Sequence, residues 1–120
     1  FLEQGAVLRE HFSHLMDEMV ERSYLAQILG HRVRCANAPF PFHSAVANRM
    51  VYSDASLDFA MTFGFDQPDR VRVSLRSRST GMHLHHLATS IAGGGHAQAA
   101  DAITNTQAIF ALSAQEPSTK

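Results

Sequence analysis

The longest regular pattern of apolar positions lies near the start of the chain. Apolar side chains recur there at steps of three and four residues: Leu8, Phe12, Leu15, Met16, Met19, Val20, Leu25, Ile28 and Leu29. This spacing is typical of one face of an α-helix, and a glycine, here Gly30, often follows the last helical residue. The pattern predicts one helix over residues 5–29. Its apolar face would pack against the rest of the domain or against a neighbouring one.

Three later segments have the composition and alternation of strands. They span residues 31–38, 57–65 and 70–77. The polar stretch 66–69 predicts a turn that joins the last two of them into an antiparallel hairpin. In the third strand the side chains alternate between two faces, with Val71, Val73 and Leu75 on one and Arg70, Arg72, Ser74 and Arg76 on the other.

A short helix is predicted between the first and second strands. Two prolines break the chain within residues 39–42, and the two phenylalanines of that stretch, Phe40 and Phe42, are expected to pack inward. Ser44 is a suitable N-cap for a helix over residues 45–51, because its hydroxyl can accept a hydrogen bond from the first helical turn.

The last third of the chain predicts less regular structure. A helix is expected over residues 82–92, whereas residues 106–114 fit either a strand or a helix, and residues 116–120 are expected to fray. All the elements together predict an α/β fold, in which a small mixed β-sheet is flanked by helices, with a long N-terminal helix.

The composition is that of one soluble domain. The chain has 120 residues, of which 45% are hydrophobic and 18% charged, and its net charge is −1. General nucleic-acid binding is disfavoured because it needs a basic excess. No apolar run approaches the roughly 18 residues that cross a bilayer, and Cys35 has no second cysteine to pair with. We therefore expect a cytoplasmic domain without a membrane partner, and Phe1 in place of Met indicates a piece of a longer protein.

The basic residues are almost all arginine, the exception being Lys120. Codon usage explains such a bias, and so does anion recognition, because a guanidinium binds an anion through two parallel hydrogen bonds. The segment Ser74-Leu75-Arg76-Ser77 places Arg76 at the end of a strand, where ligands often bind in sheet proteins. The alternative is that the arginines of this strand protect a solvated edge strand from aggregation.

The sharpest motif is Gly-Gly-Gly-His-Ala-Gln-Ala-Ala-Asp at residues 93–101. We expect Gly93, Gly94 and Gly95 to form a loop that leads into a helix, where unpaired N–H groups bind anions. His96, at the junction, can donate a hydrogen bond to a phosphate oxygen. The alternative is a helix C-cap followed by a flexible turn. The dinucleotide-binding fingerprint needs a glycine where Gln98 stands, and a P-loop needs an internal lysine.

These motifs together resemble a known domain. The order Ser-Leu-Arg-Ser, a short helix ending in Ile-Ala, and Gly-Gly-Gly-His followed by two alanines is similar to the C-terminal DHH-associated domain of the DHH phosphoesterase superfamily. The match covers residues 70–101, and a weaker match upstream extends it to nearly the whole chain. The superfamily includes oligoribonuclease and pAp-phosphatase types, RecJ-like exonucleases and proteins labelled exopolyphosphatase-related.

The resemblance implies a division of labour between two domains. An N-terminal DHH domain, which is not in this sequence, would hold manganese and hydrolyse the phosphoester. Residues 1–120 would form the single C-terminal domain that binds the substrate, without a cofactor of its own. The implied partners are a phosphorylated small molecule or short oligonucleotide and the DHH domain. The positions that match the family's substrate-binding motifs are Ser74, Arg76, Ser77, Gly93, Gly94, Gly95 and His96.

The sequence departs from the family pattern at two positions. The family often has proline where Ala97 stands, and usually glycine where Asp101 stands. Alanine suits the first turn of a helix, so the first change mainly reduces stiffness. An aspartate that faced the cleft would oppose a phosphate, so the second change bears on substrate type and affinity.

We expect no metal centre in this chain, because it has no Asp-His-His triplet. Asp54 and Asp58 are interpreted as surface carboxylates. The cluster His83, His85 and His86 is interpreted as exposed helix residues, since no nearby carboxylate or cysteine completes a ligand shell.

Two other functions compete with substrate binding for a phosphoesterase. The first is a non-catalytic nucleic-acid-binding module, because related domains also occur attached to other enzymes, such as alanyl-tRNA synthetases. The second is an interaction domain that forms a homodimer through the apolar positions between Leu8 and Leu29.

Overall fold

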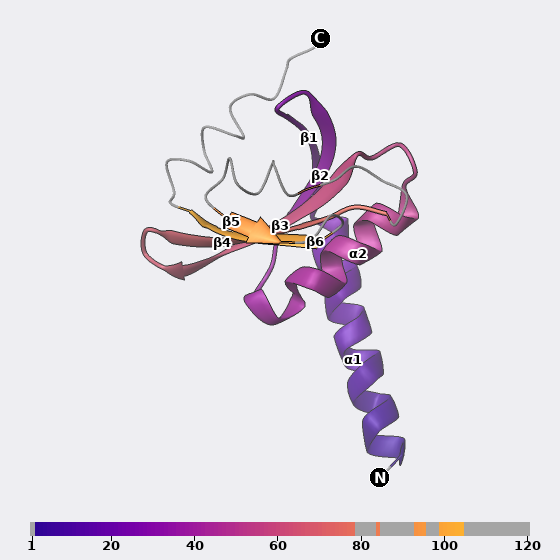
Figure 1. The fold of residues 1–120 in the computed structure, drawn as a ribbon. Helices are drawn as coiled ribbons and strands as arrows, with labels where there is room; N and C mark the ends of the chain where they lie inside the picture. The colour runs from indigo at the N-terminus through magenta and orange to yellow at the C-terminus, as the bar shows by residue number, and fades with distance from the viewer. Residues whose placement is uncertain (1, 79–83, 85–92, 96–98, 105–120) are drawn as a thin grey trace.

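The computed structural model describes residues 2–78, 84, 93–95 and 99–104. Figure 1 shows a β-sheet with one helix packed beneath it and a second, long helix that runs away from it. The elements follow in the order α1 (Leu2–Glu21), β1 (Tyr24–Ile28), β2 (His31–Asn37), the 3-10 helix η1 (Phe40–Phe42), α2 (His43–Ser53), β3 (Phe59–Gln67), β4 (Arg70–Arg76), β5 (Gly93–Gly95) and β6 (Ala99–Thr104).

The sheet is mixed, and its strand order is β1-β2-β3-β4-β6-β5. β2 and β3 pair in parallel, whereas the other neighbouring strands pair antiparallel. A parallel pair needs a crossover connection, which η1 and α2 supply here. The predicted α/β class with a small mixed sheet and a long N-terminal helix is confirmed.

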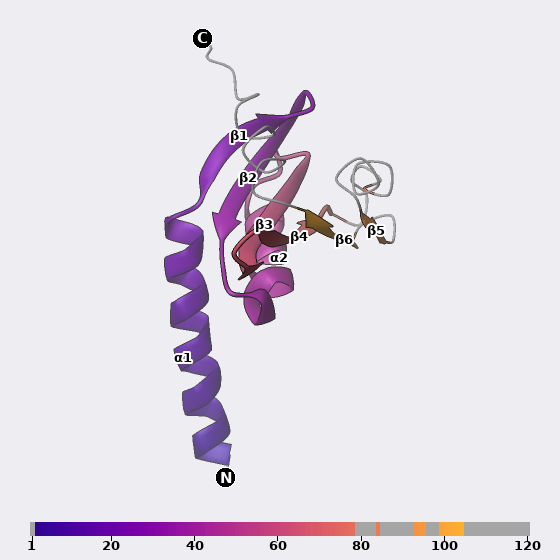
Figure 2. The ribbon, with the colours of Figure 1, turned by 90° about the vertical axis from the view of Figure 1, so that its left-hand side faces the viewer.

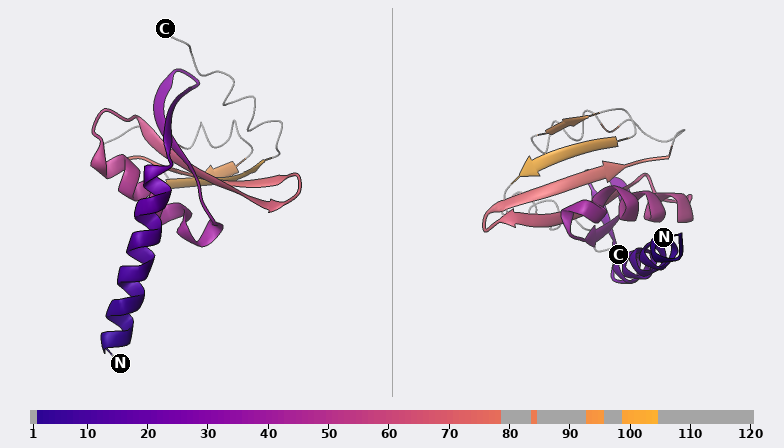
Figure 3. Two further views of the ribbon diagram at one scale, coloured as in Figure 1. Left: turned by 180° about the vertical axis from the view of Figure 1, so that it is seen from behind. Right: turned by 90° about the horizontal axis from the view of Figure 1, so that it is seen from below.

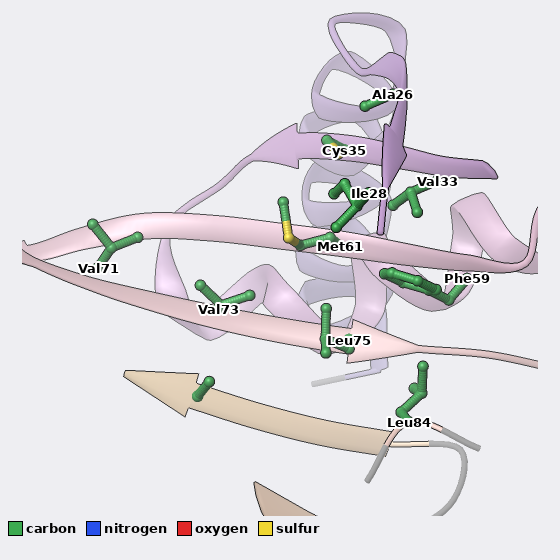
Figure 4. Packing of buried hydrophobic residues seen from close by; sticks show 11 residues of the cluster. Ala26, Ile28, Val33, Cys35, Phe59, Met61, Val71, Val73, Leu75 and Leu84 are labelled. Atoms are coloured by element: carbon green, nitrogen blue, oxygen red, sulfur yellow. The ribbon is translucent and has the colours of Figure 1, made fainter. Parts of the chain in front are cut away.

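One face of the sheet carries the larger apolar cluster. Alternate residues of five strands supply it, together with one residue from the segment that follows β4 (Figure 4). Its members are Ala26, Ile28, Val33, Cys35, Phe59, Met61, Val71, Val73, Leu75, Leu84 and Ala102. Because side chains alternate along a strand, the residues between them face the other side. That other side of β3 and β4 is the one that α2 reaches.

The opposite face packs against both helices, which lie on the same side of the sheet (Figure 3). The inward residues of α2 meet Ala36 of β2 and Ala60 of β3, and Met16, Met19 and Val20 of α1 pack against this cluster. Two alanines on the sheet leave room for the helix to approach closely. We call this side of the sheet the α2 face.

The N-terminal half of α1 extends beyond the sheet (Figure 2). Val7 and Leu8 in this half are exposed, whereas Phe12, near the middle of α1, contacts the Phe42 ring. The predicted contact of this apolar face with a neighbouring domain or a second copy stays a prediction.

The predicted single helix over residues 5–29 is wrong in its last third, because α1 ends at Glu21 and residues 24–28 form β1. Ala26 and Ile28 are buried at every second position, while Leu25 is exposed. Leu29 and Gly30 both have positive φ and connect β1 to β2 as a two-residue hairpin turn. Burial on the sheet thus prevails over the helical spacing.

The strands predicted at residues 31–38, 57–65 and 70–77 are confirmed with small shifts, as is the antiparallel hairpin of β3 and β4. Ser44 is not the N-cap, because α2 begins at His43 and its cap position is Phe42, without a side-chain cap bond. The helix expected at residues 82–92 lies outside the described residues, apart from buried Leu84, and so does the last element expected at residues 106–114.

Candidate functional site

The sheet brings the two predicted substrate-binding motifs close together. β6 pairs with β4 on one side and with β5 on the other, so Ser74 lies opposite Asp101 and Asp101 opposite Gly94. Leu75, Ala100 and Gly95 form the next row. Neighbouring strands are about 4.8 Å apart, which puts the glycine strand about 10 Å from the Ser-Leu-Arg strand. Residues far apart in sequence therefore share one region of the sheet.

The glycines themselves do not form the predicted loop that leads into a helix. Gly93–Gly95 form β5, and the alanine-rich stretch after them is β6. Ala102 is buried in the core cluster, so its short side chain serves sheet packing rather than a helix. The helix N-terminus expected here as the anion site is absent from residues 99–104. His96 lies outside the described residues.

The glycine strand still suits close approach by a ligand. β5 is the last strand in the described sheet. A strand at the end of a sheet presents backbone N–H and C=O groups along its outer edge, and glycine leaves that backbone uncovered by side chains. The chemistry expected of the motif, backbone contact with an anion, is available from a strand as it would be from a loop.

Arg76 stands at the end of β4 beside the start of α2. Its guanidinium donates to the Ser44 hydroxyl oxygen at 2.6 Å and to the Leu75 carbonyl oxygen at 2.8 Å. Ser44 is the second residue of α2, whose first turn holds no acidic residue. The positive charge of Arg76 therefore lies next to the positive end of the α2 dipole, a combination that attracts anions.

Ser74 and Ser77 lie beneath the surface. They are only 2% and 3% exposed, and the Ser74 hydroxyl lies 3.4 Å from Nδ1 of His43. The Ser74 hydroxyl thus lies against the buried His43 ring, and Arg76 is the half-buried residue of the motif. Their predicted direct contact with substrate stays a prediction.

His43 is a buried polar residue of this region that the sequence did not indicate. Its Nε2 lies 2.7 Å from the Ala38 carbonyl oxygen, and its own carbonyl accepts a hydrogen bond from the Thr62 hydroxyl at 3.0 Å. A carbonyl only accepts, so Nε2 carries the proton and Nδ1 of the neutral ring can accept from Ser74. His43 thereby ties the start of α2 to β3 and β4.

Arg78 has a different role from Arg76, although only one residue lies between them. Its guanidinium donates to the carbonyl oxygens of Val51 and Asp54, both at 3.2 Å, and of Leu57 at 2.9 Å. These carbonyls belong to the end of α2 and the loop that leads to β3. Arg78 therefore binds the backbone of its own chain.

The other arginines of β4 are not on a solvated edge strand. β4 lies between β3 and β6, so the edge-protection alternative is wrong. Arg72 shares the α2 face with Arg76 and places its guanidinium carbon 4.5 Å from the centre of the Phe40 ring. Phe40, expected to pack inward, is instead 53% exposed.

The described residues contain no group of three or more histidine, cysteine, aspartate or glutamate side chains that could hold a metal ion. Asp54 accepts hydrogen bonds from the hydroxyl and the backbone N–H of Ser56, and Asp58 accepts one from the backbone N–H of Arg32. The Ser56 hydroxyl, then its N–H, and more weakly nearby arginines hold the pKa of Asp54 below its usual 3.8. The interpretation of both aspartates as structural surface carboxylates fits these contacts. The histidine cluster lies outside the described residues.

A separate pocket of about 440 Å³ lies between α1 and the ends of β2 and β3. Leu15, Met19, Arg22 and Phe65 are among the residues that line it. None of the predicted substrate-binding residues lines it, so the candidate site is a different region, beside β4 and β5. Among the described helices none is long and apolar enough to span a membrane.

Solved structures with a similar fold include two proteins. The first is a pGpG-specific phosphodiesterase, PggH from Vibrio cholerae, with a TM-score of 0.62 and 14% identity over 91% of this chain and 38% of that one. The second is an uncharacterized protein from Helicobacter pylori G27, with a TM-score of 0.52 and 19% identity over 65% of this chain and 21% of that one. At such identities the likeness is one of fold, and this chain spans well under half of either protein.

No protein-family model matches the chain, and no curated relative matches it either.

Proposed function

We propose that this chain is the substrate-binding part of a phosphoesterase that acts on short oligonucleotides or nucleotide phosphates. The observation that carries the proposal is the strand register. It places the end of β4, which carries Arg76, and the glycine strand β5 on either side of β6. The Ser-Leu-Arg-Ser and Gly-Gly-Gly-His motifs of DHH-associated domains fall on these two places. A fold shared with a phosphodiesterase of nucleotides supports the same function.

In this proposal the two motifs hold the phosphate together. The guanidinium of Arg76 offers two parallel N–H donors to phosphate oxygens, and its bond to Ser44 fixes the direction in which it points. The positive end of α2 adds to its charge. Backbone groups of Gly93–Gly95 and the side chain of His96 contact the ligand from the other side of β6.

The hydrolytic centre belongs to a different part of the enzyme in this proposal. Among the described residues of this chain, no group of three side chains could hold the metal that DHH phosphoesterases use. A metal-binding DHH domain of the same protein is therefore proposed as the partner, and the cytoplasm as the location. The task of the chain described here is to bind and orient the phosphorylated substrate.

The test is a binding titration of the 120-residue chain with a 5′-phosphorylated dinucleotide, followed by NMR. We expect Arg76→Ala and His96→Ala each to weaken binding about 10-fold or more, because each removes hydrogen bonds to a charged ligand. Arg9→Ala is the matched control, since it removes the same charge from an exposed position of α1. Shifts in wild type should centre on Gly93–Gly95 and Arg76.

The proposal fails if Arg76→Ala and His96→Ala bind the dinucleotide as tightly as Arg9→Ala does. It also fails if the shifts on titration avoid both motifs.

A further inference from the structure

An exposed aromatic ring stands on the same face of the sheet as Arg76. Phe40 lies in η1, directly before α2, and is 53% exposed. The guanidinium carbon of Arg72 lies 4.5 Å from the centre of its ring, the distance of a stacked cation–π contact. Ile103 of β6, which pairs with Arg72, is 47% exposed. Phe40, Arg72 and Ile103 together form the Phe40 patch, which combines flat and apolar surfaces. Gly64 pairs with Arg72 and so lies in the same row of the sheet.

The Phe40 patch lies at a defined distance from the proposed phosphate site. Arg72 and Arg76 are four residues apart on one strand, so their side chains leave the same face about 13 Å apart. Ser74 lies between them and is buried against His43. The start of α2 therefore covers the sheet between the two arginines, so a ligand that contacts both must be longer than a single phosphate group and pass over the N-terminal end of this helix.

The ring of Phe40 is held in place rather than merely exposed. Its edge meets the His43 ring, with 5.5 Å between ring centres and 77° between ring planes. Pro39 and Pro41 on either side fix the backbone, and the N–H of Phe42 donates to the Pro39 carbonyl oxygen at 2.9 Å. A ring fixed before binding loses little entropy when a flat ligand stacks on it.

The chemistry of the Phe40 patch distinguishes between the phosphorylated ligands open to the proposed function. Nucleobases stack on aromatic rings and on guanidinium planes, and they do so with little dependence on sequence. A polyphosphate has no flat apolar surface and would gain nothing from Phe40 or Ile103. The exposed aromatic and apolar surface therefore suits a base.

We propose that Phe40 and Arg72 form a nucleobase subsite, which stacks a base of the nucleotide whose phosphate lies at Arg76. The inference rests on the proposed function and narrows its ligand class to nucleotides with at least one base within reach of η1. The exposed Phe40 ring beside Arg72 favours a dinucleotide over inorganic phosphates, which have no base to stack on it.

The test compares a 5′-phosphorylated diadenosine dinucleotide with tripolyphosphate as ligands of the 120-residue chain. Phe40→Leu should weaken binding of the dinucleotide about 5- to 100-fold, the range measured when one stacking residue is lost, and leave tripolyphosphate binding within twofold. Phe40→Tyr, which keeps the ring, should bind both ligands like wild type. Tyr52→Leu is the control, because Tyr52 is also an exposed aromatic residue but lies at the end of α2 remote from Phe40.

The outcomes separate this inference from the function on which it rests. Equal dinucleotide affinity in Phe40→Leu and wild type, with Arg76→Ala still impaired, overturns the subsite and leaves the phosphate site standing. An equal loss for both ligands in Phe40→Leu also overturns it, because the change would then not be specific to a base. If wild type binds neither ligand, both proposals fail.

Discussion

The contrast between Arg76 and Arg78 gives the sharpest prediction about stability. Arg78→Ala removes three hydrogen bonds from the guanidinium to backbone carbonyl oxygens of residues 51, 54 and 57. Two of these carbonyls end α2, and the third begins the approach to β3. Without Arg78 the loop between α2 and β3 keeps its covalent connection but loses its attachment to the end of β4.

The size of the effect follows from the number of bonds. At about 1 kcal/mol net for each half-buried hydrogen bond, the three together contribute about 3 kcal/mol to the free energy of unfolding. A change of this size lowers Tm by roughly 10 °C in a domain of this length. Arg76→Ala removes a bond to the Ser44 hydroxyl and one to the neighbouring Leu75 carbonyl, and neither ties the loop after α2 to the strand, so we expect a smaller loss of unfolding free energy than for Arg78→Ala.

Urea unfolding followed by circular dichroism measures both variants. Arg78→Lys serves as the partial control, because the lysine ammonium keeps the charge but cannot bond to three carbonyl oxygens at once. The stability of Arg78→Lys should fall between those of Arg78→Ala and wild type. If Arg78→Ala unfolds within 0.5 kcal/mol of wild type, the assignment of Arg78 to the backbone of its own chain is refuted. Arg78→Ala that folds stably but loses dinucleotide binding would refute it as well.

Two further predictions concern the packing of Gly64 in β3 and the hydrogen bonds of Asp54 after α2. Gly64→Ala should lower stability by about 1–3 kcal/mol, because the added Cβ would lie 2.6 Å from the Ala38 carbonyl oxygen; Gly5→Ala in α1, where the new Cβ meets nothing closer than 3.5 Å, should stabilise the chain slightly. Ser56→Ala should raise the pKa of Asp54 toward 3.8, measured by a carboxyl NMR titration, because Ser56 supplies the hydroxyl that lowers it. Since the folded pKa is lowered, this contribution to stability is present above pH 3.8 and lost as the pH falls through the folded value.

The fold was predictable from sequence where local pattern and tertiary burial agree. β2, β3 and β4 alternate in sequence, and the residues that they supply to the larger apolar cluster alternate in the structure. Sequence pattern and burial disagree at residues 24–28. Leu25 and Ile28 continue the helical spacing of α1, but the core buries Ala26 and Ile28. Helical periodicity cannot reveal that residues 24–28 form a strand, because the turn at Leu29 and Gly30, which pairs β1 with β2, decides this.

The residues of the candidate site stay a prediction from the sequence, and their geometry was not predicted. Arg76 and the glycines were expected to bind a phosphate, and the register of β6 explains how two distant motifs can share a ligand. The strand character of residues 93–95 and 99–104 was missed, since glycine and alanine have low strand propensity and only pairing with β4 makes them strands. His43 and Phe40 were missed as site residues because they approach from a segment some thirty residues upstream, without a motif of their own.

The two arginines at the end of β4 owe their different roles to the direction of α2. Arg78 reaches the C-terminal end of that helix, where the last carbonyl oxygens need donors and the dipole is negative. There a guanidinium stabilises the fold. Arg76 reaches the N-terminal end, where the dipole is positive and the first turn carries no acidic side chain. A guanidinium at that end adds positive charge to the positive end of the helix, and in the proposed function a phosphate binds there. The same residue type, at positions 76 and 78, thus stabilises the fold at one end of α2 and is proposed to bind a phosphate at the other.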